Sequence, residues 1–199
     1  MTYVELIVVL GIFGTMSAIV LTNYSTFHDK IDIRNLANEI ALKVFQAQKD
    51  SSSGKLPPST NTPFVSNWKP SYGVYFDRST NDKSKSFVYF TDLYNAGVCD
   101  ISCETKAGGL DYLEPTIFIT KGNYVSKLEV FQTGTSTLTE FNNLSLIFSR
   151  SNPGVTFGTY VNSVGSIIPG ISYASITISS TSGITSTIKV FSSGRIQIK

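Results

Sequence analysis

An apolar run near the N-terminus restricts this chain more than any other feature of its sequence. From Leu6 to Leu21 the run carries no charged side chain, and Glu5 lies at its edge. At a rise of about 1.5 Å per residue, a helix over residues 4–21 covers most of a hydrocarbon layer of roughly 30 Å. The run is apolar on all sides, unlike a core helix, and it lacks the basic residues and cleavage site of a secretory signal. We therefore expect a helix that is buried in lipid or among other helices.

The pattern becomes amphipathic after about Phe27. Apolar residues then recur at the spacing of one helical face. This stripe comprises Ile33, Leu36, Ala37, Ile40, Ala41, Val44 and Phe45. No strong helix breaker lies between Leu21 and Ile33, whereas Ser, Gly and Pro follow Asp50. The sequence therefore predicts one helix from about Thr2 to about Asp50, roughly 70 Å long, of which half protrudes.

After Pro58 the sequence is rich in β-branched and aromatic residues, which indicates strands. The segments read as strands are YGVYF, SFVYF, TIFIT, YVSKLEVFQ, LSLIF, YASITIS, STIKVF and GRIQIK. The last three alternate clearly and predict an antiparallel meander. The predicted fold class is α+β, with one long N-terminal helix whose amphipathic half packs on an antiparallel β-sheet. The predicted parts are a transmembrane or filament-core helix (1–28), the amphipathic half of that helix (29–50) and a β-rich globular domain (51–199).

Composition and charge limit the classes of function. Charged residues make up 15% of the 199 residues, and the net charge is +2. Soluble domains typically contain about 25% charged residues. A net charge this small does not indicate a nucleic-acid footprint or a polyacidic partner. The abundance of Ser, Thr, Gly and Asn suits an extracellular β-rich surface.

The two cysteines, Cys99 and Cys103, lie close together in VCDISC. In an exported protein such a pair most often forms a small disulfide loop, with free thiols and a metal or redox site as the alternatives. Zinc needs about four ligands, and His28 is the only histidine. His28 also lies on the long helix, a poor place for a catalytic cleft. We expect no enzyme activity, no cofactor and no metal site.

The opening MTYVELIVVLGIFGTMSAIVLTNY resembles the N-terminus of the type IV pilin and pseudopilin family, the subunits of bacterial type IV pili and related filaments. In that family a prepilin peptidase removes a short basic leader, and a glutamate stands at the fifth mature position. Met1 and Glu5 fall in that register, although Phe is commoner than Met and Pro is often found where this chain has Thr22. The closing ITISSTSGITSTIKVFSSGRIQIK is similar to the C-terminal strands of H-type pseudopilins and related minor pilins.

The resemblance implies a structural subunit of a type IV pilus-like extracellular filament that polymerises through its apolar helix. The alternative is a minor pilin or pseudopilin acting as a tip binding module in DNA uptake, adhesion or type II secretion. The implied partners are further copies in a helical filament, the prepilin peptidase and the pilus assembly machinery. The chain would lie in the bacterial inner membrane before assembly and on the cell surface afterwards. No leader precedes Met1, so we expect a processed and methylated N-terminus there.

Glu5 is implied to form an assembly salt bridge with the α-amine of Met1 on a neighbouring subunit. An unpaired carboxylate at the bilayer centre costs about 2.5–3.5 kcal/mol, so a cation inside a filament core would stabilise it. A head-to-tail contact of this kind propagates a filament. The alternative is an interfacial glutamate that reaches back to water. Gly11 and Gly14 are interpreted either as a packing face for another helix or as points where the helix melts.

Two weaker candidates remain. Lys189, Arg195 and Lys199 lie in the last strands and are weak DNA-binding candidates, because three charges are few for contacting phosphates. Solvated strand ends are the simpler interpretation. The motif DRSTND (77–82) offers oxygen ligands for Ca²⁺, but it lacks the EF-hand pattern and reads better as a turn.

Overall fold

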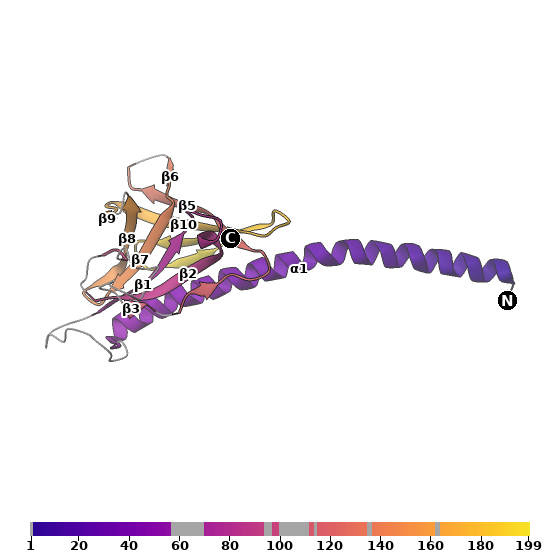
Figure 1. Ribbon diagram of the computed structural model, residues 1–199, viewed down its shortest axis with the longest axis horizontal. Coiled ribbons are helices and arrows are strands. Elements are labelled where there is room, and N and C mark those ends of the chain that lie inside the picture. Colours follow the sequence, from indigo (N-terminus) through magenta and orange to yellow (C-terminus); the bar gives the residue numbers. More distant parts are fainter. Residues whose placement is uncertain are drawn as a thin grey trace.

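A long helix protrudes from a body of β-strands in the computed structural model of the chain (Figure 1). The structure describes residues 2–56, 70–93, 97–99, 112–113, 115–134, 137–161 and 164–199. The elements are α1 (Tyr3–Ser53), β1 (Ser71–Asp77), the 3-10 turn η1 (Lys83–Lys85), β2 (Ser86–Asp92), β3 (Tyr112–Leu113), β4 (Ile117–Phe118), β5 (Tyr124–Gln132), β6 (Leu138–Glu140), β7 (Asn143–Ser149), β8 (Asn152–Val161), β9 (Val164–Ile167), β10 (Ile171–Ser179), β11 (Thr185–Phe191) and β12 (Ile196–Ile198).

Helix α1 has a capped end on each side. At the start, the Thr2 hydroxyl accepts a hydrogen bond from the Glu5 amide, and the Glu5 carboxylate accepts one from the Thr2 amide. This reciprocal capping box satisfies backbone donors that a helix otherwise leaves free. At the other end Gly54 adopts the left-handed conformation (φ 66°), and its N–H donates to the carbonyls of Asp50 and Ser51. Glycine suits this position because it lacks a Cβ.

The C-terminal half of α1 contributes one buried face. Its buried apolar residues are Ile33, Leu36, Ala37, Ile40, Val44 and Ala47. Phe45, which the sequence analysis assigned to this stripe, is 55% exposed. Phe45 follows Ile33 by twelve residues. At about 100° per residue, Phe45 therefore lies about 120° away from Ile33 around the helix axis. The prediction for Phe45 is therefore wrong, and Ala47 lies on the buried face instead.

The strands form two antiparallel sheets. One has the order β3-β2-β1-β7-β8-β9, with β4 also paired to β2, and the other has the order β12-β11-β10-β5-β6. The predicted fold class, a long helix over one antiparallel sheet, is therefore wrong, and the globular part is mostly β. The physical reason is that a strongly twisted open sheet rarely exceeds about ten strands before it splits into two packed sheets. The predicted meander of the last three strands is confirmed in β10, β11 and β12.

Both sheets and the helix share one core. Helix α1 contacts β1 and β7 of the first sheet and β10, β11 and β12 of the second. Ile40 of the helix, Phe76 of the first sheet and Ile176 of the second belong to this same buried cluster. Because successive strand residues point to opposite faces, a smaller cluster lies on the other face of the first sheet. That cluster comprises Tyr75, Val88, Phe90, Cys99 and Ile147.

Polar contacts fix the C-terminal end of α1 to the first sheet. The Tyr89 hydroxyl on β2 donates to Asp50 Oδ2 at 2.8 Å, and Lys55 Nζ lies 2.9 Å from the same oxygen. The Tyr72 hydroxyl on β1 donates to the Lys55 carbonyl at 2.6 Å. Burial alone would raise the pKa of Asp50, but the hydrogen bonds from Lys55 and Tyr89 outweigh it and hold that pKa below its ordinary value.

Candidate assembly surface

Large apolar side chains are exposed along the N-terminal half of α1, which we call the apolar segment (residues 3–19). The exposed residues are Tyr3, Val4, Leu6, Ile7, Val8, Val9, Leu10, Ile12, Phe13, Met16 and Ile19. They occupy every side of the helix, and Figure 1 shows the sheets packed only against the other half of α1. Within the part of the chain that the structure describes, no helix is both long and apolar enough to cross a lipid bilayer.

The apolar segment carries a large driving force for association. Fully burying one large aliphatic side chain contributes about 1.5–3 kcal/mol. The eleven side chains are already partly covered, with exposures from 48% at Leu6 to 79% at Tyr3. Covering the remainder would contribute on the order of 10–20 kcal/mol per chain before the cost of association. Contiguous apolar surfaces of this kind mark contacts with other molecules.

Glu5 lies at the N-terminal end of the apolar segment and already has a partner within the chain. Its Oε2 accepts a hydrogen bond from the Thr2 amide at 2.8 Å. Sequence reasoning missed this contact, although the spacing of Thr2 and Glu5 is the signature of a capping box. The predicted partner, the amine of Met1 in a neighbouring chain, stays a prediction, since Met1 lies outside the described residues. A carboxylate has room for several donors, so the cap is compatible with an ion pair.

Among the described residues, nothing packs against Gly11 or Gly14. A Cβ atom built on either glycine meets no atom within 4 Å. Glycine in a helix interior costs about 1 kcal/mol relative to alanine. A benefit of these glycines must therefore come from outside the single chain or from local opening of the helix. Both interpretations from the sequence stay open.

Cys99 is fully buried and disulfide-bonded. It belongs to the small cluster on the far face of the first sheet, and its amide donates to the Ser145 hydroxyl at 3.3 Å. The neighbouring Val98 packs so tightly on β8 that a Cβ at Gly158 would lie 2.6 Å from its Cγ1. The pairing with Cys103 stays a prediction, because Cys103 lies outside the described residues.

The structure gives the three basic candidates different surroundings. Lys189 Nζ lies 4.4 Å from the ring centroid of Tyr173, and Arg195 Cζ lies 3.9 Å from that of Phe191. The two rings pair across β10 and β11 with centroids 5.6 Å apart. Both cations are therefore engaged in cation–π contacts on the sheet. Lys199 instead lines a groove beside α1, whose wall includes neither of the other two.

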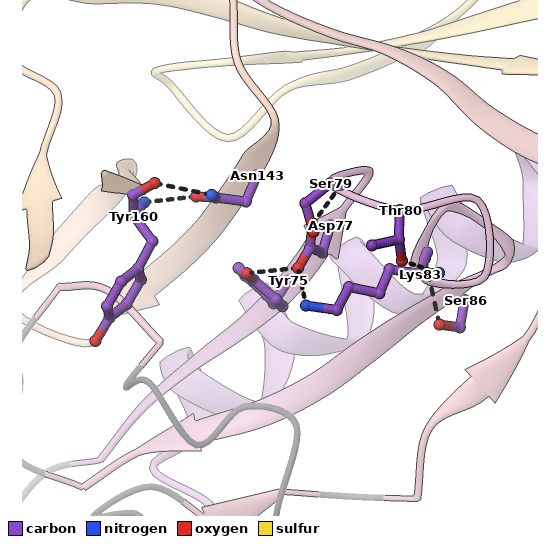
Figure 2. A network of polar contacts seen from close by, with 8 residues as sticks. All are labelled: Tyr75, Asp77, Ser79, Thr80, Lys83, Ser86, Asn143 and Tyr160. Carbon is purple, nitrogen blue, oxygen red and sulfur yellow. Dashed lines mark hydrogen bonds and ion pairs between the residues drawn. The ribbon is translucent and has the colours of Figure 1, made fainter. Parts of the chain in front are cut away.

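The DRSTND motif forms a turn in which the Asp77 side chain bonds nearby residues (Figure 2). Asp77 Oδ1 accepts from the Ser79 amide at 2.7 Å, the geometry of an Asx turn, and Oδ2 lies 3.3 Å from Lys83 Nζ. Opposite Asp77 on β7, the Asn143 side chain bonds both backbone groups of Tyr160. Among the residues described, no group of three or more His, Cys, Asp or Glu side chains is arranged to hold a metal ion.

Among the described residues, the apolar segment is the most prominent candidate site, because it combines a long run of exposed apolar side chains with a single carboxylate at its end. No protein-family model, curated protein or solved structure matches this chain.

Proposed function

We propose that the chain is a structural subunit of a bacterial type IV pilus-like extracellular filament and that it polymerises through the apolar half of α1. One observation carries this proposal: the apolar segment is exposed on every side and lies clear of both sheets (Figure 1). A helix with one apolar stripe needs a single partner, whereas a helix that is apolar all round needs neighbours on all sides. A central bundle of such helices meets this need.

The shape of the chain favours an open assembly. Helix α1 has 51 residues and is therefore about 75 Å long, with the β-sheets confined to one half. Neighbours can bury their apolar segments only if the globular parts lie outside the bundle and are staggered along its axis. A repeated head-to-tail contact with stagger does not close on itself, so it yields a helical filament.

Glu5 is the only charged residue in the apolar segment. Inside a bundle of apolar helices, we propose that its carboxylate pairs with the α-amine of Met1 in an adjacent chain while still accepting the Thr2 amide. Removing one partner of a buried ion pair typically costs about 3–5 kcal/mol, because the other charge is left uncompensated. Repeated at every subunit, that loss would prevent filament growth.

The test uses Glu5→Gln, because glutamine can still complete the capping box but carries no charge. In bacteria that express the variant as the only pilin, we expect few surface filaments by electron microscopy and an unchanged amount of folded chain. Thr2→Ala is the matched control, since it removes the hydroxyl of the cap and keeps the charge, and we expect near-normal filaments. Normal filaments with Glu5→Gln would refute the ion pair. Absence of filaments from the unmodified chain would refute the function itself.

A further inference from the structure

We propose that two oppositely charged flanks of α1 bind each other in neighbouring copies of this chain. The basic flank consists of Lys30 and Arg34, and the acidic flank consists of Asp32 and Glu39. The inference rests on the proposed filament function and adds a contact between the globular parts of adjacent subunits. The flanks lie in the half of the helix that packs on the sheets, well away from the apolar segment.

The basic flank borders an open groove between α1 and the ends of β11 and β12. The groove has a volume of about 500 Å³, and Lys30, Arg34 and Lys199 line it together with Asn38 and Ser186. Lys30 and Arg34 are exposed. Among the described residues, neither has an ion-pair or hydrogen-bond partner. The groove therefore offers cationic side chains that the chain itself leaves uncompensated.

The spacing of Lys30 and Arg34 makes this arrangement unfavourable in a single chain. Residues four apart lie next to each other on a helix, and like charges there destabilise it. An anionic partner in the groove would turn this repulsion into attraction. The observation points to a partner with carboxylates.

The acidic flank borders a second groove on the other side of the helix. This groove has a volume of about 190 Å³ and is lined by Asp32, Glu39 and Lys121 together with apolar residues of β4 and its surroundings. Lys121 Nζ lies 2.6 Å from Asp32 Oδ1, so one of the two carboxylates is already paired. Glu39 is exposed and has no ion-pair partner among the residues described. Glu39 is thus the acid available to another chain.

The positions of the two flanks on the helix select a second copy as the partner. At about 100° per residue, Arg34 lies about 40° from Lys30 around the helix, whereas Glu39 lies about 180° from Lys30. Opposite charges on opposite sides of one element make the chain complementary to itself, but only head to tail. Aligning Glu39 with the middle of the basic flank shifts neighbours by about seven residues, or about 10 Å along the axis. Such a contact extends a staggered assembly.

A charge-swap experiment on the full chain tests this contact. Lys30→Glu with Arg34→Glu gives two acidic flanks, and Glu39→Lys gives two basic flanks. Each variant alone should form at least about tenfold fewer filaments, because like charges facing each other across a contact repel and weaken it. Co-expression of the two variants should restore filaments, since every contact then joins an acidic flank to a basic one. A single chain carrying all three substitutions should also assemble.

The controls separate this contact from general charge effects and from the proposed function. Lys49→Glu with Lys127→Glu changes the net charge by as much as Lys30→Glu with Arg34→Glu does, but at exposed positions off both flanks, and filament number should stay normal. Normal filaments from either single-flank variant, or no recovery on co-expression, would overturn the contact while leaving the proposed function intact. If the unmodified chain forms no filaments, both proposals fall together. Circular dichroism of each variant shows whether it is folded.

Discussion

Removing the hydroxyl of Tyr89 probes how α1 is held to the sheets. In the folded chain this hydroxyl donates to Asp50 Oδ2 at 2.8 Å, and both residues are buried, with exposures of 1% and 8%. Tyr89→Phe keeps the ring and its packing and removes only the donor. Asp50 then retains the ammonium of Lys55 but loses one of the groups that compensate its burial.

The expected loss follows from the charge of the acceptor. A hydrogen bond to a charged group typically contributes about 1.5–3 kcal/mol, more than a bond between neutral groups. Because the ring stays in place, no large cavity adds to this value. We therefore expect Tyr89→Phe to lower the free energy of unfolding by about 2 kcal/mol at pH 7.

The effect should depend on pH with a defined sign. The pKa of Asp50 is lower in the folded chain than its ordinary value, so the unfolded chain binds the proton more readily. Stability from the ionised carboxylate is then fully present above the unfolded pKa of about 3.9, and it is lost as the pH falls through the folded pKa. The difference between the unmodified chain and Tyr89→Phe should accordingly shrink below about pH 4.

Urea unfolding of the full chain in non-ionic detergent, followed by circular dichroism at pH 7 and at pH 3, measures this difference. Tyr72→Phe is the matched control, because its hydroxyl donates to the neutral carbonyl of Lys55. Tyr72→Phe should lower the free energy of unfolding by about 1 kcal/mol at both pH values. We would reject the reasoning if Tyr89→Phe did not lower the free energy of unfolding at pH 7, or if it lowered this free energy equally at pH 3.

Two further predictions concern the globular part. Deleting residues 1–28 should leave a soluble, monomeric, folded β-rich domain, because the buried face of α1 begins at Ile33; an unfolded circular dichroism spectrum would contradict this division. Gly158→Ala places a Cβ where Val98 lies, so it should lower the free energy of unfolding by about 1–3 kcal/mol. A Cys99–Cys103 disulfide should therefore be reduced faster in this variant than in the unmodified chain. Mass spectrometry of the chain, alkylated without prior reduction, checks the disulfide itself. Alkylation of both Cys99 and Cys103 would refute it.

Local sequence patterns were sufficient for much of the secondary structure. The predicted segment YVSKLEVFQ coincides with β5, because its β-branched and aromatic residues favour strand conformation. Strand β8 was missed because Pro153, Gly154 and Gly158 resemble turn signals. In the structure Gly158 allows Val98 to approach, and a Cβ at Gly154 would lie 2.6 Å from the Ser192 carbonyl oxygen. These glycines serve close packing, which depends on distant residues that a local pattern does not contain.

The arrangement of strands and the charged flanks depend on contacts between distant segments. Strand β5 pairs with β10, which follows more than thirty residues later, so periodicity alone could not show that the strands divide into two sheets. The groove that joins Lys30 and Arg34 to Lys199 likewise forms only when the last strand packs beside the helix. By contrast, the capping box of Thr2 and Glu5 is local, so its spacing could have predicted it, although the sequence analysis missed it.

The way α1 lies against the two sheets has a mechanical consequence for a filament under tension. Force entering at the apolar segment would run along the helix axis and reach the sheets through the buried face between Ile33 and Ala47. This face is loaded in shear, so its contacts share the force at once, whereas a helix attached only at its tip would peel away one turn at a time. The free part of α1 lacks such support, and its hydrogen bonds lie parallel to the pull. Under rising load that part would extend first and act as a spring in series with a body that stays folded.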